Sequence, residues 1–178
     1  MPASSDRKST ASHQGGSLPE QRLRADVRGL VQLAIVEASN RGAGAVEAEH
    51  LLLALLFDRR NRAATALAAA GLDYDAFAAA LLTERENSLR AAGVEPIAAE
   101  RLASAGQRSR TTFSASAKQA LAAGHRVSTS RRSHTMRHTD VAAGVLSSQV
   151  GTVPRALAYA GFDRSELLKA VVSATQEG

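Results

Sequence analysis

Three histidines and one aspartate in the second half of the chain have side chains of the kind that bind metal. His134 and His138 are four residues apart, with His125 and Asp140 nearby. A zinc site needs four well-placed ligands, and two histidines alone rarely complete one. The chain also has no cysteine, which excludes thiolate ligands and disulfides. We therefore expect no metal site and no cofactor.

Arginines in the same region have the chemistry to contact phosphate. They are Arg126, Arg131, Arg132 and Arg137. The net charge is +5, but neither interleaved aromatic residues nor a recognition helix accompanies the cluster. A solvated loop or a surface for an acidic partner explains it better, and DNA binding remains a secondary hypothesis.

No motif for catalysis is present. Serine, histidine and aspartate are not spaced as nucleophile, base and orienting residue, and no Gly-x-Ser-x-Gly elbow occurs. The chain also lacks the Gly-x-x-x-x-Gly-Lys-[Ser/Thr] loop that cradles nucleotide phosphates. We predict that the protein is not an enzyme.

Glu49 and His50 stand directly before a run of leucines. They could form a charged contact point at the start of a helix. The structural alternative is favoured: an acid in the first turn suits the helix dipole, and His50 would fill a polar gap beside the core.

Composition indicates that helices position these residues. Hydrophobic residues make up 44% of the chain but aromatic residues only 3%, so the core must consist mainly of alanine, leucine and valine. No apolar run approaches the ~20 residues of a membrane span. The polar N-terminus, residues 1–22, is predicted to be a disordered tail. We expect a soluble, cytoplasmic protein with no membrane partner.

The chain matches itself at an offset of 90 residues. Residues 66–73 (ALAAAGLD) face residues 156–163 (ALAYAGFD), with six of eight positions identical. Apolar residues in the first copy recur at helical spacing; they are Val27, Leu30, Val31, Ala34, Ile35 and Ala38. The same face in the second copy is smaller and more polar. The sequence predicts an all-α fold, a tandem repeat of two four-helix units with pseudo-twofold symmetry.

The helix boundaries follow from this repeat. A second helix near Glu49–Phe57 should be the buried centre of its unit, and its counterpart is Thr139–Ser147. Gly71 and Gly161 should end the third helices. We place the first repeat at residues 23–82 and the second at 113–178. The connection, 83–112, repeats the helix–Gly–acid stop at Leu89–Glu95, and we predict a short helix over Pro96–Ala103 and a flexible joint from Gly106 to Thr112.

The run Glu49-His50-Leu51-Leu52, upstream of Gly71-Leu72-Asp73, resembles the Clp N-terminal (Clp R) domain of ClpA- and ClpC-type unfoldases. Residues 113–118 (FSASAK) resemble the Phe-Thr-Pro-Arg-Ala-Lys run that opens the second repeat of that family. The resemblance covers residues 23–175 and is stronger in the first repeat. It implies a tandem repeat of two four-helix units that docks adaptors, substrate segments or regulatory peptides.

The resemblance also implies candidate binding residues. Glu49 matches the acidic residue with which some members recognise phosphorylated arginine, whereas Thr139 stands where the family often has glutamate. Leu23-Arg24 replaces the usual Phe-Thr, and Arg24 would repel a guanidinium while attracting phosphate. These departures argue against a phosphoarginine site.

Phe113 and Lys118 match positions on the peptide-binding surface of the family. As one of few aromatic residues, Phe113 is favoured to be buried, although aromatic anchors are also typical of interfaces. Apolar contacts near Phe113 would then hold a peptide between the repeats. Glu49, Lys118 and Asp140 would set its charge preference.

We therefore expect a non-catalytic accessory, adaptor or decoy that acts in trans on a Clp unfoldase. Its partners would be a Clp ATPase, an adaptor or substrate polypeptides. Two alternatives stay open. One is a small basic DNA-binding regulator, and the other is a protein that sequesters small peptides directed at a Clp ATPase.

Overall fold

A computed structural model of the protein describes residues 25–94, 112–133 and 135–176, and these ranges are mostly helical. Their elements, in chain order, are α1 (Ala25–Asn40), β1 (Ala45–Val46), α2 (Ala48–Phe57), α3 (Arg62–Ala69), α4 (Tyr74–Ala91), β2 (Thr112–Phe113), α5 (Ala115–Ser130), α6 (His138–Leu146), α7 (Thr152–Tyr159) and α8 (Arg164–Gln176).

The helices confirm the predicted tandem repeat. The helices α5, α6, α7 and α8 each begin 90 residues after α1, α2, α3 and α4, respectively. Glu49 and Thr139 are accordingly the second residues of equivalent helices. The helix α4 runs on to Ala91, past residue 82, where the sequence analysis ended the first repeat. The predicted tail, the Pro96–Ala103 helix and most of the predicted joint lie outside the described residues.

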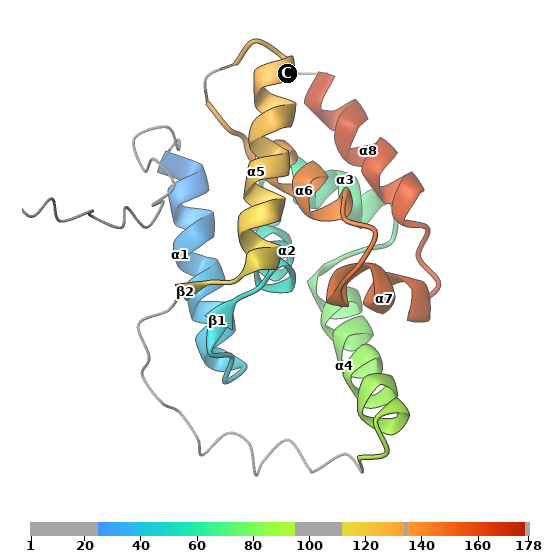
Figure 1. The fold of residues 1–178 in the computed structure, drawn as a ribbon. Helices are drawn as coiled ribbons and strands as arrows, with labels where there is room; N and C mark the ends of the chain where they lie inside the picture. Colours follow the sequence, from blue (N-terminus) through green and yellow to red (C-terminus); the bar gives the residue numbers. More distant parts are fainter. Residues whose placement is uncertain (1–24, 95–111, 134, 177–178) are drawn as a thin grey trace, which may run out of the picture.

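The two repeats are interleaved rather than packed side by side (Figure 1). The helix α4 of the first repeat packs against α7 of the second, and α8 packs against α3 in return. The two central helices, α2 and α6, contact each other between these pairs. Buried residues of both repeats therefore form a single hydrophobic core.

The central helix of each repeat is apolar on almost every side. In α2, all residues from Ala48 to Leu56 are buried except Glu49, and in α6 all residues from Thr139 to Leu146 are buried. Such a helix is stable only when other helices surround it. The leucine run of α2 and the small apolar residues of α6 thus explain why both repeats close around these two helices.

Glycine ends four of the helices in the same way. The φ values of Gly42, Gly71, Gly93 and Gly161 are 64°, 86°, 72° and 77°. In each case the next residue donates its N–H to a carbonyl five residues back, as in the pair Leu72 N–Leu67 O at 2.9 Å. This left-handed stop is strained for residues other than glycine, which explains the recurring helix–Gly pattern.

A short strand pair joins the two repeats. The strands β1 and β2 are parallel, with Val46 opposite Phe113, and Ser114 N donates to Val46 O at 3.0 Å. No strand-like run in the sequence signals this pair, because each strand has only two residues. Its effect is to hold the start of α5 against the start of α2.

Small residues bring α5 and α6 unusually close together. A methyl group on Gly144 would lie 2.2 Å from Ala120 O, and one on Gly124 would lie 2.6 Å from Asp140 O. The counterparts of Gly144 and Gly124 in the first repeat are Ala54 and Ala34, respectively. The smaller apolar face of the second repeat is therefore compensated by closer approach of the backbones.

The two central helices begin with related caps. The N–H of Glu47 donates to Nδ1 of His50 at 2.9 Å, and the N–H of Arg137 donates to Oδ2 of Asp140 at 2.8 Å. His50 and Asp140 hold equivalent positions, so one acceptor has replaced another. Burial, together with the charge of Arg41, lowers the pKa of His50 from 6.5 to about 4 and keeps its ring neutral.

Within the described residues, no single helix is both long and apolar enough to cross a membrane. The pair α3–α4 reaches that length and composition together, but its two helices are bent by 71°.

We predict that Gly144→Ala lowers the free energy of unfolding by roughly 3 kcal/mol, because the new methyl group meets backbone atoms that have no room to move. The matched control is Gly29→Ala in α1, where nothing lies within 4 Å and better helix propensity should add about 0.5–1 kcal/mol. Urea unfolding of both variants measures the difference. Equal stabilities would contradict the close approach of α5 and α6.

We also predict that His50 makes stability depend on pH. Its folded-state pKa of about 4 lies below its ordinary value of 6.5, so the unfolded chain binds more protons between these values. The stabilisation is complete above about pH 6.5 and falls by up to roughly 3 kcal/mol as the pH decreases to 4. His50→Gln keeps an acceptor that does not titrate, so its unfolding free energy should vary less over this range. Parallel profiles for the two proteins would refute the assignment.

Candidate functional site

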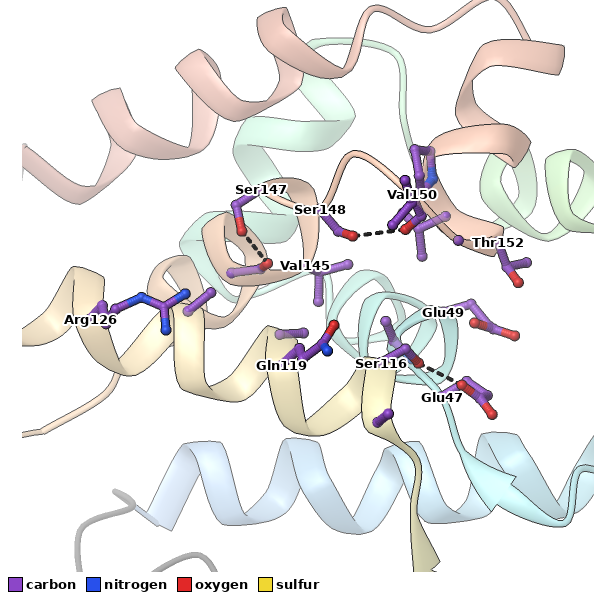
Figure 2. A pocket seen from close by; sticks show the side chains of 18 residues that line it. Glu47, Glu49, Ser116, Gln119, Arg126, Val145, Ser147, Ser148, Val150 and Thr152 are labelled. Atoms are coloured by element: carbon purple, nitrogen blue, oxygen red, sulfur yellow. Dashed lines mark hydrogen bonds between the residues drawn. The ribbon is translucent and has the colours of Figure 1, made fainter.

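A groove lies where the start of α2 meets the second repeat (Figure 2). Its walls are the start of α2, one side of α5, and the end of α6 with the loop to α7. Its volume is about 530 Å³. Both repeats contribute, so the groove exists only in the assembled fold.

Ser116 fixes the geometry at one end of the groove. Its hydroxyl accepts the N–H of Ala48 at 3.1 Å and donates to Oε2 of Glu47 at 2.5 Å. Ser114 lies 3.0 Å from the same hydroxyl and caps α5 by accepting the N–H of Ala117. The strand pair thus anchors an acidic corner in which Glu47 and Glu49 both line the groove.

The carboxylate of Glu49 is half-buried at this corner. Burial is the main reason that its pKa is raised above the ordinary 4.5, and the charges of Glu47 and Glu84 add to the effect. Its own backbone N–H and Arg155 act in the opposite direction. A carboxylate that loses water in this way gains from a cation placed beside it.

The neighbouring cation, Arg155, is already paired. Its Nε lies 2.8 Å from Oε1 of Glu84, and Ser88 donates to the same oxygen at 2.7 Å. Glu84 belongs to α4 and Arg155 to α7, so this ion pair also joins the repeats. Arg155 therefore does not pair with Glu47 or Glu49, the two acidic residues that line the groove.

The remaining lining is mainly apolar and small. It includes Ala120, Ala123, Val145, Val150 and Val153. The side chain of Val150 is exposed, at 81%. Arg126 lines the end of the groove opposite Glu47 and Glu49 (Figure 2). A ligand in the groove would meet an acidic end, an apolar middle and a basic end.

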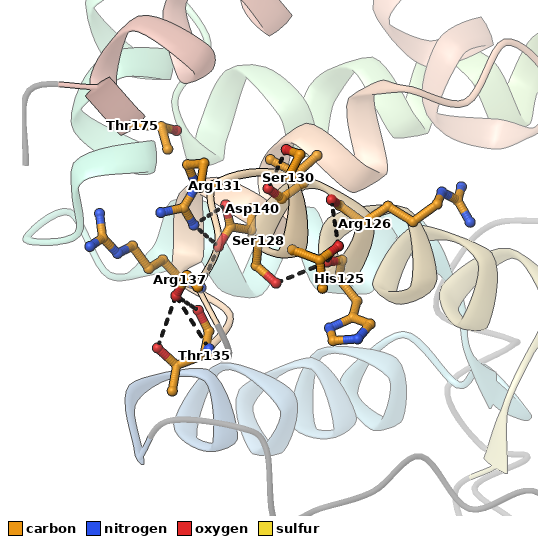
Figure 3. Close-up of polar contacts among 12 residues, drawn as sticks. His125, Arg126, Ser128, Ser130, Arg131, Thr135, Arg137, Asp140 and Thr175 are labelled. Carbon is orange, nitrogen blue, oxygen red and sulfur yellow. Dashed lines mark hydrogen bonds and ion pairs between the residues drawn. The ribbon is translucent and has the colours of Figure 1, made fainter.

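The structure places Thr139 and Asp140 inside the protein rather than on this groove. Asp140 is 0% exposed, and Arg131 donates to both its oxygens at 2.5–2.6 Å (Figure 3). Thr139 is buried, and its hydroxyl has no hydrogen-bond partner among the described residues. Asp140 therefore acts on Arg131 and on the cap of α6.

The predicted arginine cluster does not form one surface. Arg131 points inward to Asp140, while Arg126 and Arg137 point in opposite directions (Figure 3). Among the described residues, no group of three His, Cys, Asp or Glu side chains could hold a metal ion. His134, Leu23 and Arg24 lie outside the residues that the structure describes.

Phe113 and Lys118 lie close together in the chain, Phe113 on β2 and Lys118 on α5, the helix that follows this strand. Phe113 is half-buried and packs against the core. Its position is thus intermediate between the buried core residue and the exposed interface anchor that the sequence left open. Lys118 is exposed on α5. Neither is among the residues that line the groove.

Ser116 and the α6–α7 loop were not predicted from the sequence, and Arg126 was assigned to an arginine cluster rather than to the groove. Their roles follow from a contact between repeats that no local motif encodes. The 90-residue offset could have pointed to Ser116. It places this residue at the start of the first helix of the second repeat, one helix before Thr139-Asp140, the degraded counterpart of Glu49-His50.

Comparison with known proteins agrees with this architecture. Residues 22–107 match the sequence model of the Clp repeat (R) N-terminal domain family. A search of curated protein sequences gives no match.

Solved structures share the fold, among them the following three. The N-terminal domain of the chaperone ClpD from Arabidopsis thaliana has 18% identity and a TM-score of 0.61, and the alignment covers 90% of this chain and 99% of that one. The Hsp104 N-terminal domain from Candida albicans has 12% identity and a TM-score of 0.60, with 84% and 88% covered. A structure from a study of a malarial protein secretion system has 14% identity and a TM-score of 0.58, with 85% and 93% covered.

The sequence match ends before β2, whereas the shared fold includes both repeats. The degraded second motif is thus outside the sequence match, although the helices of the second repeat keep their places in the fold. The resemblance is confirmed: residues 22–107 match the Clp repeat (R) N-terminal domain family by sequence, and both repeats share the fold of Clp and Hsp104 N-terminal domains.

Proposed function

We propose that this protein is a docking module in which the groove between the repeats holds a short polypeptide segment of an adaptor or substrate of a Clp unfoldase. The Clp N-terminal domain is a non-catalytic interaction domain. The observation that carries the proposal is the groove itself, with Glu47 and Glu49 at one end and an apolar middle.

The charges of the groove favour a particular segment. A lysine or arginine of the ligand would pair with Glu49, whose partly dehydrated carboxylate gains from a cation. The following residue would rest on Ala123 and Val150, and an acidic group would reach Arg126. A volume of about 530 Å³ suits two or three side chains of an extended peptide.

Phe113 and Lys118 would extend the contact beyond the groove. Phe113 sits on β2, beside the acidic corner, and is half-buried. Lys118 is exposed one turn into α5 and would attract acidic residues of the same partner. In this proposal, Thr139 and Asp140 support the fold, and Leu23 and Arg24 stay candidates from the sequence resemblance alone.

The proposed role is that of an accessory for Clp proteolysis. Delivery of a bound segment to an unfoldase would make the protein an adaptor, whereas retention of it would make the protein a decoy. A degradation assay with a purified Clp unfoldase separates these roles, because the first accelerates and the second slows loss of the bound polypeptide.

We predict that Glu49→Thr weakens binding of a basic–apolar peptide by about tenfold, because one charge-assisted contact is lost. Thr is the residue of the second repeat at this position, so the helix should tolerate it. The matched control is Glu166→Gln, which removes an exposed carboxylate that pairs with Lys169 on α8. Fluorescence anisotropy with the full chain measures both affinities.

The pH provides a second readout. Because the pKa of Glu49 is raised, its carboxylate loses charge at a higher pH than an ordinary glutamate, and affinity should fall there with it. Unchanged affinity in Glu49→Thr would exclude the groove as the binding site. A crosslinker placed at Gln119, in the groove, should recover a Clp component. If it recovers none, and a small peptide binds tightly, the result would instead support a protein that sequesters peptides directed at a Clp ATPase.

A further inference from the structure

The face that the pseudo-symmetry relates to the groove has a different chemical character. Ser147 and Arg126 line the groove, and their counterparts 90 residues earlier are Phe57 and Val36. Phe57 is 59% exposed at the end of α2, and Val36 is 49% exposed on α1. A polar serine and a cation are thus replaced by two exposed apolar side chains.

Phe57 is held in place by a second aromatic ring. Its ring meets that of Tyr74 edge-to-face, with centroids 5.9 Å apart and planes at 74°. The hydroxyl of Tyr74 donates to Glu37 at 3.2 Å. An exposed aromatic side chain that its neighbours hold rigid loses little entropy when a partner covers it.

The loop that follows Phe57 is basic. Arg59 and Arg60 are exposed, Arg62 begins α3, and Asp58 is the acid among residues 57–62. Asp58 accepts from Arg60 at 3.2 Å, and the pKa of its carboxyl is lowered by hydrogen bonds from the backbone and side chain of Arg60. One acid against three arginines leaves this segment positive.

The second repeat has no such charge at the equivalent positions. Gln149, Val150 and Thr152 are the counterparts of Arg59, Arg60 and Arg62. On the first repeat, the nearby carboxylate of Glu37 is 4% exposed and pairs with Arg41, so it does not offset the surface charge. The two equivalent faces therefore differ in charge as well as in polarity.

We propose that Phe57, Val36 and the Arg59–Arg60 loop form a second docking surface, for an acidic polypeptide segment with one aromatic or large aliphatic side chain. The apolar side chain would lie against Phe57 and Val36. Carboxylates on either side of it would pair with the arginines, whose planar groups bind carboxylates in a bidentate manner.

This surface is separate from the groove, and its assignment does not depend on the function proposed for the groove. The groove has its acids at the end where a ligand cation would bind, whereas the second surface selects ligand acids. The same chain could thus hold two segments of opposite charge.

The test uses the full chain and a fluorescent peptide of about ten residues, rich in Glu and Asp around one Phe. We expect Phe57→Ser to weaken its binding by about tenfold, and Arg59→Gln with Arg60→Val to weaken it by a similar factor and to reduce the salt dependence. Each change installs the residue that the second repeat has at that position. Glu49→Thr, on the groove, should leave this affinity unchanged.

Two further peptides complete the design. Replacing the single Phe of the peptide by Ser should remove most of the affinity, and exchanging its acids for lysines should abolish binding to this surface. Equal binding of the acidic and basic peptides, or no effect of either set of variants, overturns the proposal. So does displacement of the peptide by mixed duplex DNA, or a self-association that Phe57→Ser abolishes, because each identifies a different occupant.

Discussion

The exchange of helices between repeats is the constraint on which the rest of the structure depends. Each repeat leaves an apolar surface on its third helix, and the fourth helix of the other repeat covers it, as α4 does for α7 and α8 for α3. Neither repeat can bury its apolar central helix alone, so both must fold together around α2 and α6. The groove follows directly, because the strand pair and this interleaving place Ser116 of one repeat beside Glu47 of the other.

Duplication gave two equivalent surfaces, and their side chains have diverged. At the start of the central helix, Glu49 remains half-exposed and acidic, whereas Thr139 is buried and neutral. At the end of that helix, Phe57 and its arginine loop face solvent where the second repeat has Ser147 and an uncharged loop. The caps differ in the same way, since neutral His50 and ionic Asp140 accept equivalent backbone N–H groups. One backbone plan thus presents two distinct chemical surfaces.

The sequence predicts most of the fold, because helical periodicity and the 90-residue offset are properties of local residue order. The glycine stop at Gly71 and the leucine run of α2 are examples, and both are found where expected. Three features were not predictable, since each depends on the folded arrangement rather than on local residue order. They are the interleaving of the repeats, the two-residue strands, and the burial of Asp140 beside Arg131. Glu49 was identified from a motif, but the groove residues Ser116 and Arg126 needed the assembled repeats.

The central claim is that ligand binding requires both repeats at once. Hydrogen–deuterium exchange of the full chain, with and without a bound basic–apolar peptide, tests it most directly. The account predicts that slower exchange appears together at residues 47–49, along one side of α5, and in the loop between α6 and α7, because these segments form one groove. Slower exchange confined to the segments of a single repeat would contradict it.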